Sequence, residues 1–128
     1  MWRRPSSPSA RGALVSALLV AGCADPGPRS VTTVVGGDAT RGAQAIGAYG
    51  CGSCHVIPGI DGATGTAAPP LTSFAARTSV AGEVANTPPQ LVAWIMNPQA
   101  IEPGTAMPNL GVRARDARDI AAYLYTLR

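Results

Sequence analysis

Two cysteines and a histidine stand within five residues, as Cys51-Gly52-Ser53-Cys54-His55. Thiols three positions apart lie on one side of a helical turn, so both can form thioethers with the two vinyl groups on one edge of a porphyrin. The histidine that follows directly is then placed to bind the iron from one face of the ring. This spacing predicts one covalently attached haem c, held by Cys51 and Cys54, with His55 as an axial iron ligand.

Two other kinds of site use a pair of cysteines separated by two residues. A thioredoxin-like redox pair follows a strand in a βαβ pattern, and this sequence shows no alternation of strands and helices. A structural zinc site needs four ligands, but the chain offers only one more cysteine, Cys23, and no second histidine. Haem attachment is therefore favoured, and a haem-free protein with a thiol pair or metal clip remains the alternative.

The second axial ligand can be inferred from the residue types that are present. Histidine, lysine and methionine can each complete such an iron site, but the chain has no second histidine and no lysine. Met96 falls in an expected helix, where methionine more often fills the core. Met107 lies in the segment 102–111, which two prolines stiffen. We therefore expect Met107, rather than Met96 or an open site, opposite His55, and a thioether ligand should raise the reduction potential.

The positive charge of the chain is concentrated at its start. The formal net charge is +3, but Arg3, Arg4 and Arg11 all lie in the first eleven residues. From Cys23 onward seven arginines balance seven acidic residues. The basic patch that nucleic-acid binding requires is therefore absent, and we expect no nucleic-acid partner.

The first 37 residues read as an export signal and a tether. A basic opening precedes the apolar run 13–21, which is about half the ~20 residues needed to span a bilayer. The run ends in Leu-Val-Ala-Gly-Cys23, which resembles the lipobox of bacterial lipoproteins, where the cysteine carries a diacylglycerol. An ordinary signal peptide that leaves Cys23 as a free thiol is the alternative. We expect a signal peptide at 1–22, a linker at 23–37 and a periplasm-facing protein anchored by lipid in the inner or the outer membrane.

The elements that position these residues are predicted to be helices joined by long Gly/Pro-rich loops. Asp38 is the expected N-cap of a helix over Ala39–Tyr49, which leads into the haem motif. Two prolines at 88–89 favour a second helix, which Pro98 ends, and a third is expected over Arg115–Leu127. Residues 77–89 are expected to form a loop. With only 5% aromatic residues, the chain needs a buried macrocycle to complete its core.

The order of these features resembles the class I cytochromes c over roughly residues 38–127. The positions that carry the resemblance are Gly42, Cys51, Cys54, His55, Pro69, Met107 and Tyr123. The resemblance implies a cytochrome c domain over 38–128: an all-α fold with three main helices around one haem. It also implies that the terminal helices cross at Gly42 beside Tyr123, and that the Pro69 carbonyl orients His55. Trp94 is either a core residue or a donor near a haem propionate.

The same resemblance implies one-electron transfer between respiratory or periplasmic redox partners. A six-coordinate iron has no open position, so we expect an electron carrier without a small-molecule substrate rather than an enzyme. Whether the carrier acts alone or as a subunit of a larger oxidoreductase stays open. The alternative function is a haem-based gas sensor or a peroxidase-like protein with an open sixth coordination site.

Overall fold

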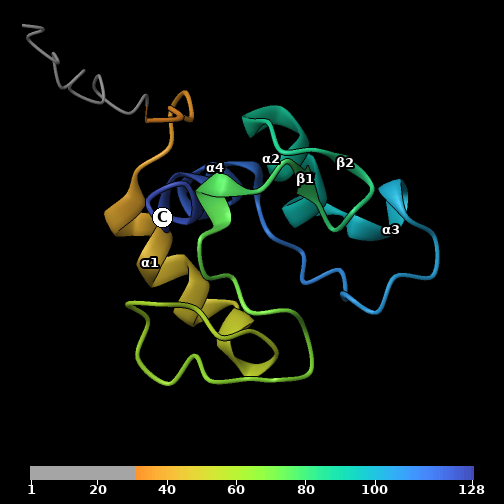
Figure 1. Cartoon of the computed structure of the whole chain (residues 1–128), viewed down its shortest axis with the longest axis horizontal. Helices are drawn as coiled ribbons and strands as arrows, with labels where there is room; N and C mark the ends of the chain where they lie inside the picture. The colour runs from red at the N-terminus through yellow and green to blue at the C-terminus, as the bar shows by residue number, and fades with distance from the viewer. Residues whose placement is uncertain (1–30) are drawn as a thin grey trace, which may run out of the picture.

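The structure is a computed structural model that describes residues 31–128. In this part of the chain the elements are α1 (Ala39–Ala48), η1 (Cys51–Ser53), η2 (Phe74–Ala76), β1 (Ser79–Val80), β2 (Val84–Ala85), α2 (Pro88–Met96), α3 (Pro98–Ile101) and α4 (Ala114–Leu124) (Figure 1). The prediction of an all-α fold with three main helices is confirmed. The expected signal peptide and Cys23 lie outside the described residues.

Helices α1 and α4 pack against each other (Figure 1). They cross at Gly42. A Cβ atom on Gly42 would collide with the backbone carbonyl of Asp119, so only glycine permits this close approach. The same Cβ would lie 3.0 Å from Cβ of Tyr123. The predicted crossing at Gly42, with Tyr123 beside it, is confirmed.

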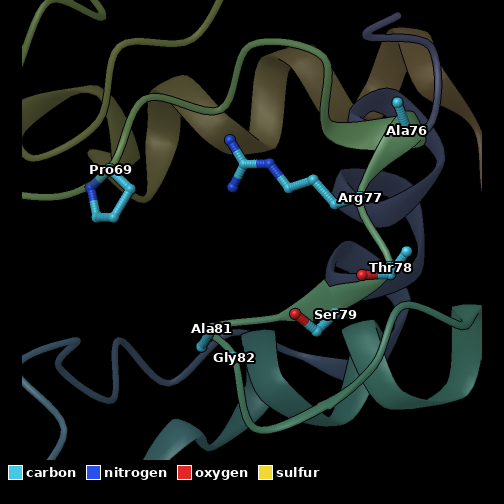
Figure 2. Close-up of a pocket in the computed structure, with 7 residues that line it drawn as sticks. All are labelled: Pro69, Ala76, Arg77, Thr78, Ser79, Ala81 and Gly82. Carbon is cyan, nitrogen blue, oxygen red and sulfur yellow. The ribbon is translucent and has the colours of Figure 1, made fainter.

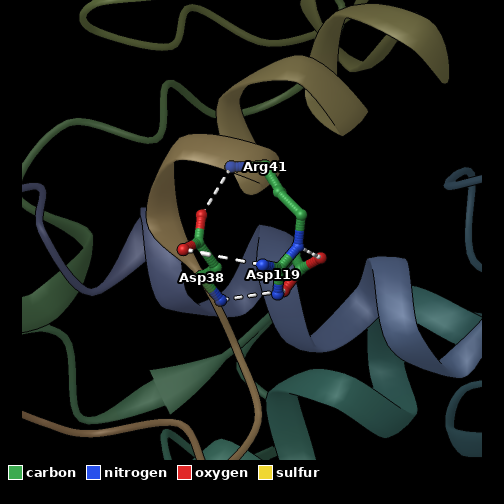
Figure 3. A network of polar contacts seen from close by, with 3 residues as sticks. All are labelled: Asp38, Arg41 and Asp119. Atoms are coloured by element: carbon green, nitrogen blue, oxygen red, sulfur yellow. Dashed lines mark hydrogen bonds and ion pairs between the residues drawn. The ribbon is translucent and has the colours of Figure 1, made fainter.

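A buried carboxylate joins the start of α1 to the middle of α4 (Figure 3). Asp119 is 2% exposed and accepts hydrogen bonds from Arg41 Nε, Arg41 Nη2 and the backbone N–H of Asp38, each at 2.8 Å. Asp38 itself caps α1, as predicted, by accepting from the backbone N–H of Arg41. The hydrogen bonds from Arg41 hold the pKa of Asp119 below its usual value. The α1–α4 crossing is therefore fixed by charge as well as by close packing.

Helix α2 packs against α4, and the short helix α3 follows in contact with α2. Helix α2 begins at Pro88, where the missing N–H costs no hydrogen bond, and Pro98 starts the separate short helix α3. Leu91, Trp94 and Ile95 are the buried residues of α2. A long loop, residues 102–113, then leads from α3 to α4 and carries Met107.

Two segments differ from the sequence-based prediction. Residues 79–85, expected to be loop, form the hairpin β1–β2, whose two-residue strands are too short to show any alternation. Asn86 follows this hairpin, donates to the carbonyls of Phe74 and Arg77, and accepts from Tyr125 Oη at 2.9 Å. Helix α4 ends at Leu124 rather than at 127 because the last residues form tighter turns.

Candidate functional site

Helix α1 delivers the two thiols at its C-terminal end. Gly50 adopts a left-handed conformation (φ 71°) that ends the helix, and the single turn η1 follows at once. The backbone N–H groups of Cys54 and His55 both bond to the carbonyl of Cys51, so the motif is one tight turn. Cys51 and Cys54 form no disulfide and are both partly buried, and burial raises the pKa of the Cys51 thiol.

The ring of His55 is oriented by the backbone of Pro69. Nδ1 of His55 lies 2.7 Å from the Pro69 carbonyl oxygen. A carbonyl can only accept, so Nδ1 carries the proton, and Nε2 keeps a free lone pair for a metal. This is the arrangement by which proteins fix the tautomer of a metal-binding histidine.

The chain from Cys51 to Leu71, here called the histidine loop, is held together by its own backbone. Its backbone N–H to carbonyl bonds run from Ile57 to Ala63, Gly65 to Gly52, Ala68 to Cys54 and Leu71 to Val56, at 2.8–3.2 Å. A Cβ on Gly65 would collide with the carbonyl of Ser53, so the two stretches pack in direct contact. The cysteines and His55 therefore stand on a cross-linked loop.

Residues 102–112, here called the methionine loop, bring the thioether of Met107 to the same region. Met107 is half-buried, and Trp94 Nε1 donates to its Sδ at 3.0 Å. Gln99 Nε2 donates to the backbone carbonyl of Met107 at 2.6 Å. Side chains from α2 and α3 thus determine where Met107 lies.

The histidine loop and the methionine loop border one apolar cleft. The residues that line the apolar cleft are Ile46, Cys51, His55, Ile57, Leu71, Ile95, Met107, Leu110, Val112, Ile120 and Leu124. Three of the predicted site residues, Cys51, His55 and Met107, therefore face one space although they are far apart in the sequence. Apart from the imidazole and the thiol, every lining side chain is a hydrocarbon or a thioether.

A second, more polar cavity adjoins the segment that orients His55 (Figure 2). It is lined by Pro69, Ala76, Arg77, Thr78, Ser79, Ala81 and Gly82. The guanidinium of Arg77 points toward Pro69, and its Nη2 donates to the carbonyls of Pro70 and Thr72. Successive carbonyls at 69 and 70 are thus held by His55 and by Arg77.

These two spaces fit the chemistry of a haem. An apolar cleft with thiols at its edge suits the ring and its vinyl groups, and imidazole nitrogen and thioether sulfur are established iron ligands. The guanidinium of Arg77 and the hydroxyls of Thr78 and Ser79 suit carboxylates such as the haem propionates. The described residues thus supply a counterpart for each part of the cofactor.

Trp94 and Met96 both pack in or against the core. Trp94 is 6% exposed, as expected for a core residue, and its N–H points to Met107 Sδ, while the role beside a propionate stays a prediction. Met96 is partly buried against the core and is not among the residues that line the apolar cleft. This location agrees with the core-filling role assigned to it from the sequence.

Sequence reasoning missed Gln99 and, for Arg77, which it considered only as a rim contact for a redox partner, the contacts beside this site. Gln99 lies in a four-residue helix, which is too short to show helical periodicity. Its position, just after the proline that ends the preceding helix and just before the loop of the predicted ligand, was a usable signal. Arg77 was assigned to an irregular loop. Its partners are the backbone carbonyls of Pro70 and Thr72, which no residue pattern identifies.

None of the helices within residues 31–128 has the length and apolar character that crossing a bilayer requires.

Comparison with known proteins agrees with this geometry. The cytochrome c family model matches residues 39–128, which is well over half of the chain. No solved structure gives a significant match to the chain.

Three curated proteins are similar over about seven-tenths of the chain. Cytochrome c oxidase subunit 2 of Alkalihalophilus pseudofirmus is 36% identical over 92 residues, covering 70% of this chain and 26% of that protein. The cytochrome c-type cyt cy of Rhodobacter capsulatus is 33% identical over 100 residues, covering 71% and 50%. Cytochrome c oxidase subunit 2 of Bacillus subtilis is 32% identical over 89 residues, covering 68% and 25%. The chain thus spans between a quarter and a half of the length of these relatives.

Haem c, attached covalently, is the cofactor of domains of this kind, and the family match confirms the predicted cofactor. The predicted resemblance and the helical fold are confirmed by the same match. A haem electron carrier is the function that the family and the relatives support. The chain belongs to the cytochrome c family.

Proposed function

We propose that this protein carries single electrons on one haem, whose iron is bound by His55 and Met107. The main support for this proposal is that the imidazole of His55, with its tautomer fixed, and the thioether of Met107 line the same apolar cleft. Cys51 and Cys54 would form the two thioether bonds to the haem. When bound, haem supplies an iron that alternates between the ferric and ferrous states.

The side chains around the cleft would set the reduction potential. A soft thioether stabilises ferrous iron relative to a second imidazole or an oxygen ligand. The apolar lining disfavours the additional positive charge of ferric iron, because it excludes water. The N–H of Trp94 aimed at Met107 Sδ acts in the same direction, since it withdraws electron density from the sulfur. We therefore expect a higher potential than a bis-histidine haem would give in the same cleft.

The partners would be redox proteins rather than small molecules. Two relatives are named as subunits of cytochrome c oxidase and one as a c-type cytochrome. We extend this context to the chain and propose that it exchanges electrons with a donor and an acceptor of a respiratory or periplasmic chain. Bound iron with both axial positions filled leaves no site for a substrate, which supports a carrier over an enzyme.

We further propose export and a lipid anchor at Cys23, on the sequence pattern at residues 1–23. The test is fractionation of cells that express the wild type and Cys23→Ala. A lipid-anchored protein stays with the membrane fraction until Cys23 is replaced. Membrane association that persists in Cys23→Ala would contradict the anchor.

The haem assignment is tested by a denaturing gel stained for haem, with reduced-minus-oxidised spectra of the same samples. We expect covalent haem in the wild type, none in the double variant Cys51→Ala/Cys54→Ala, and full retention in the control Cys23→Ala. Haem that remains attached in the double variant would contradict the assigned thioethers.

Carbon monoxide separates the carrier from its alternative. An iron with both ligands in place should not bind the gas when reduced at neutral pH. Rapid binding to the wild type would instead favour a gas sensor or a peroxidase-like protein with an open sixth site.

A further inference from the structure

The backbone around Met107 is held in an unusual way. Within the described residues, no N–H or carbonyl of residues 106–112 bonds to another backbone group. Two side chains of the loop act instead, since Thr105 Oγ1 accepts from the N–H of Met107 at 3.4 Å and Asn109 Oδ1 accepts from that of Gly111 at 2.9 Å. Such local bonds shape the loop but do not fix it to the rest of the domain.

Gln99 joins this part of the methionine loop to helix α3 by a hydrogen bond. Its Nε2 donates to the carbonyl of Met107 at 2.6 Å, across eight positions of sequence. Among residues 31–128 this is the one hydrogen bond from outside the methionine loop to the backbone of 106–112. Gln99 itself stands in α3, directly after the buried Pro98, so the donor is attached to a packed element.

The side-chain oxygen of Gln99 indicates that packing alone does not explain why a glutamine stands at this position. Gln99 Oε1 is buried and has no hydrogen-bond partner among residues 31–128. An unpaired buried acceptor opposes folding, and a leucine would occupy similar space without that penalty. The amide is therefore best explained by the one bond that it makes.

We propose that Gln99 is a positioning residue that keeps Met107 on the iron by holding the Met107 carbonyl. This inference rests on the proposed ligation by His55 and Met107. Without the bond from Nε2, residues 106–112 are held only by hydrogen bonds within the loop, by the contact of Trp94 with the sulfur and by the packing of Val112 in the core. The thioether then leaves the iron more readily, and an external ligand competes more successfully.

Imidazole binding to the ferric protein, followed by absorbance, tests the proposal. The variant Gln99→Leu removes the donor, and Gln99→Glu keeps the shape but places an acceptor against the Met107 carbonyl. Gln90→Leu makes the same chemical change at an exposed position of α2 and is the matched control. We expect imidazole affinity to rise about two- to tenfold in Gln99→Leu, to rise more in Gln99→Glu, and to stay unchanged in the control.

A second background distinguishes positioning from a general structural role. In Met107→Ala, where no thioether competes, Gln99→Leu should leave imidazole affinity unchanged. An equal rise in both backgrounds, or a lower unfolding midpoint with unchanged affinity, would overturn the proposal.

Failure of the underlying ligation gives a different result. If Met107→Ala itself binds imidazole no more tightly than the wild type, Met107 is not an iron ligand, and both proposals fall. If Met107→Ala binds more tightly but neither Gln99 variant does, the ligation stands and only the role of Gln99 is overturned.

Discussion

The histidine loop and the methionine loop border the same apolar cleft, but different kinds of bond stabilise them. The histidine loop is cross-linked by its own backbone at several points, and Pro69 within it orients His55. In the methionine loop, residues 106–112 make no backbone–backbone hydrogen bond in the described structure, and side chains from α2 and α3 hold Met107. One proposed ligand, His55, is thus held by the backbone of its own loop, while the other, Met107, is held by a few side chains from other elements.

The difference between the two loops matches the different tasks of the two proposed ligands. The covalent bonds proposed for Cys51 and Cys54, and the proposed ligand His55, must be in place for the chain to retain its haem. If Met107 is the second axial ligand, as we propose, its thioether needs only to remain on the iron in both oxidation states. We therefore expect changes in the histidine loop to affect folding or haem content, and changes near Met107 to affect the iron's coordination and potential.

The largest expected contrast is between the two ligands themselves. His55→Ala removes the nitrogen ligand that would hold the ring in place, so we expect little haem-bearing protein. Met107→Ala should keep its covalent haem and gain carbon monoxide binding in the reduced state. Haem content per chain and a carbon monoxide difference spectrum measure both effects. Equal loss of haem in the two variants would remove the distinction between the loops.

Glycine replacements compare the two loops without touching a ligand. A Cβ on Gly65 collides with backbone of the histidine loop, so Gly65→Ala should lower the free energy of unfolding by about 3 kcal/mol. Gly104 has φ 90° but open space around it, so Gly104→Ala should cost only about 1 kcal/mol through backbone strain. Denaturant unfolding of both variants checks the order. A larger loss for Gly104→Ala would contradict it.

The ion pair of the buried Asp119 with Arg41, which joins α1 to α4, should make stability depend on pH. Because Arg41 lowers the pKa of Asp119, this carboxylate stabilises the fold above its unfolded pKa of about 3.9, and the contribution is lost as pH falls through the lower folded value. Asp119→Asn should lower stability near pH 7 by about 1–2 kcal/mol and reduce the loss of stability in acid. It should leave carbon monoxide binding unchanged.

Asp61→Asn, at an exposed position of the histidine loop, is the matched control for this experiment. Unfolding midpoints of both variants and the wild type between about pH 2 and 7 give the comparison. An acid dependence in Asp119→Asn as steep as in the wild type would show that the buried carboxylate does not carry it.

The smallest expected effect concerns the sulfur of Met107. Trp94→Phe keeps most of the buried ring but removes the N–H that donates to Sδ. The sulfur then donates more electron density to iron, so the reduction potential should fall by on the order of tens of millivolts. Redox titration measures this shift. An unchanged or higher potential would show that the hydrogen bond does not act on the bound sulfur.

The sequence was most informative where residue type and spacing carry the chemistry. The haem motif, the cap at Asp38, the proline start of α2 and the glycine at the helix crossing all follow from local rules. Asp119 is a charged residue of the last helix, for which the sequence predicted no partner, yet it is buried against α1. It lies four residues before Tyr123, hence on the same face of α4, and this spacing was a signal for its position.

The features that the sequence did not reveal depend on contacts between distant segments. The partners of Gln99 and Arg77 are loop carbonyls, which any residue supplies, so no residue pattern identifies them. Likewise, Tyr125 showed no role in the sequence because its partner, Asn86, is placed by a hairpin too short to predict. In this chain the expected ligands could therefore be predicted from the sequence, but the residues that hold them in position could not.

X-ray absorption at the iron edge of the purified ferric protein tests the central claim most directly. If His55 and Met107 both bind the iron, the wild type should show nitrogen neighbours and one sulfur neighbour. Met107→Ala should lose the sulfur, and Met96→Leu should keep it. A wild-type iron without a sulfur neighbour, or one that keeps its sulfur in Met107→Ala, would contradict the account.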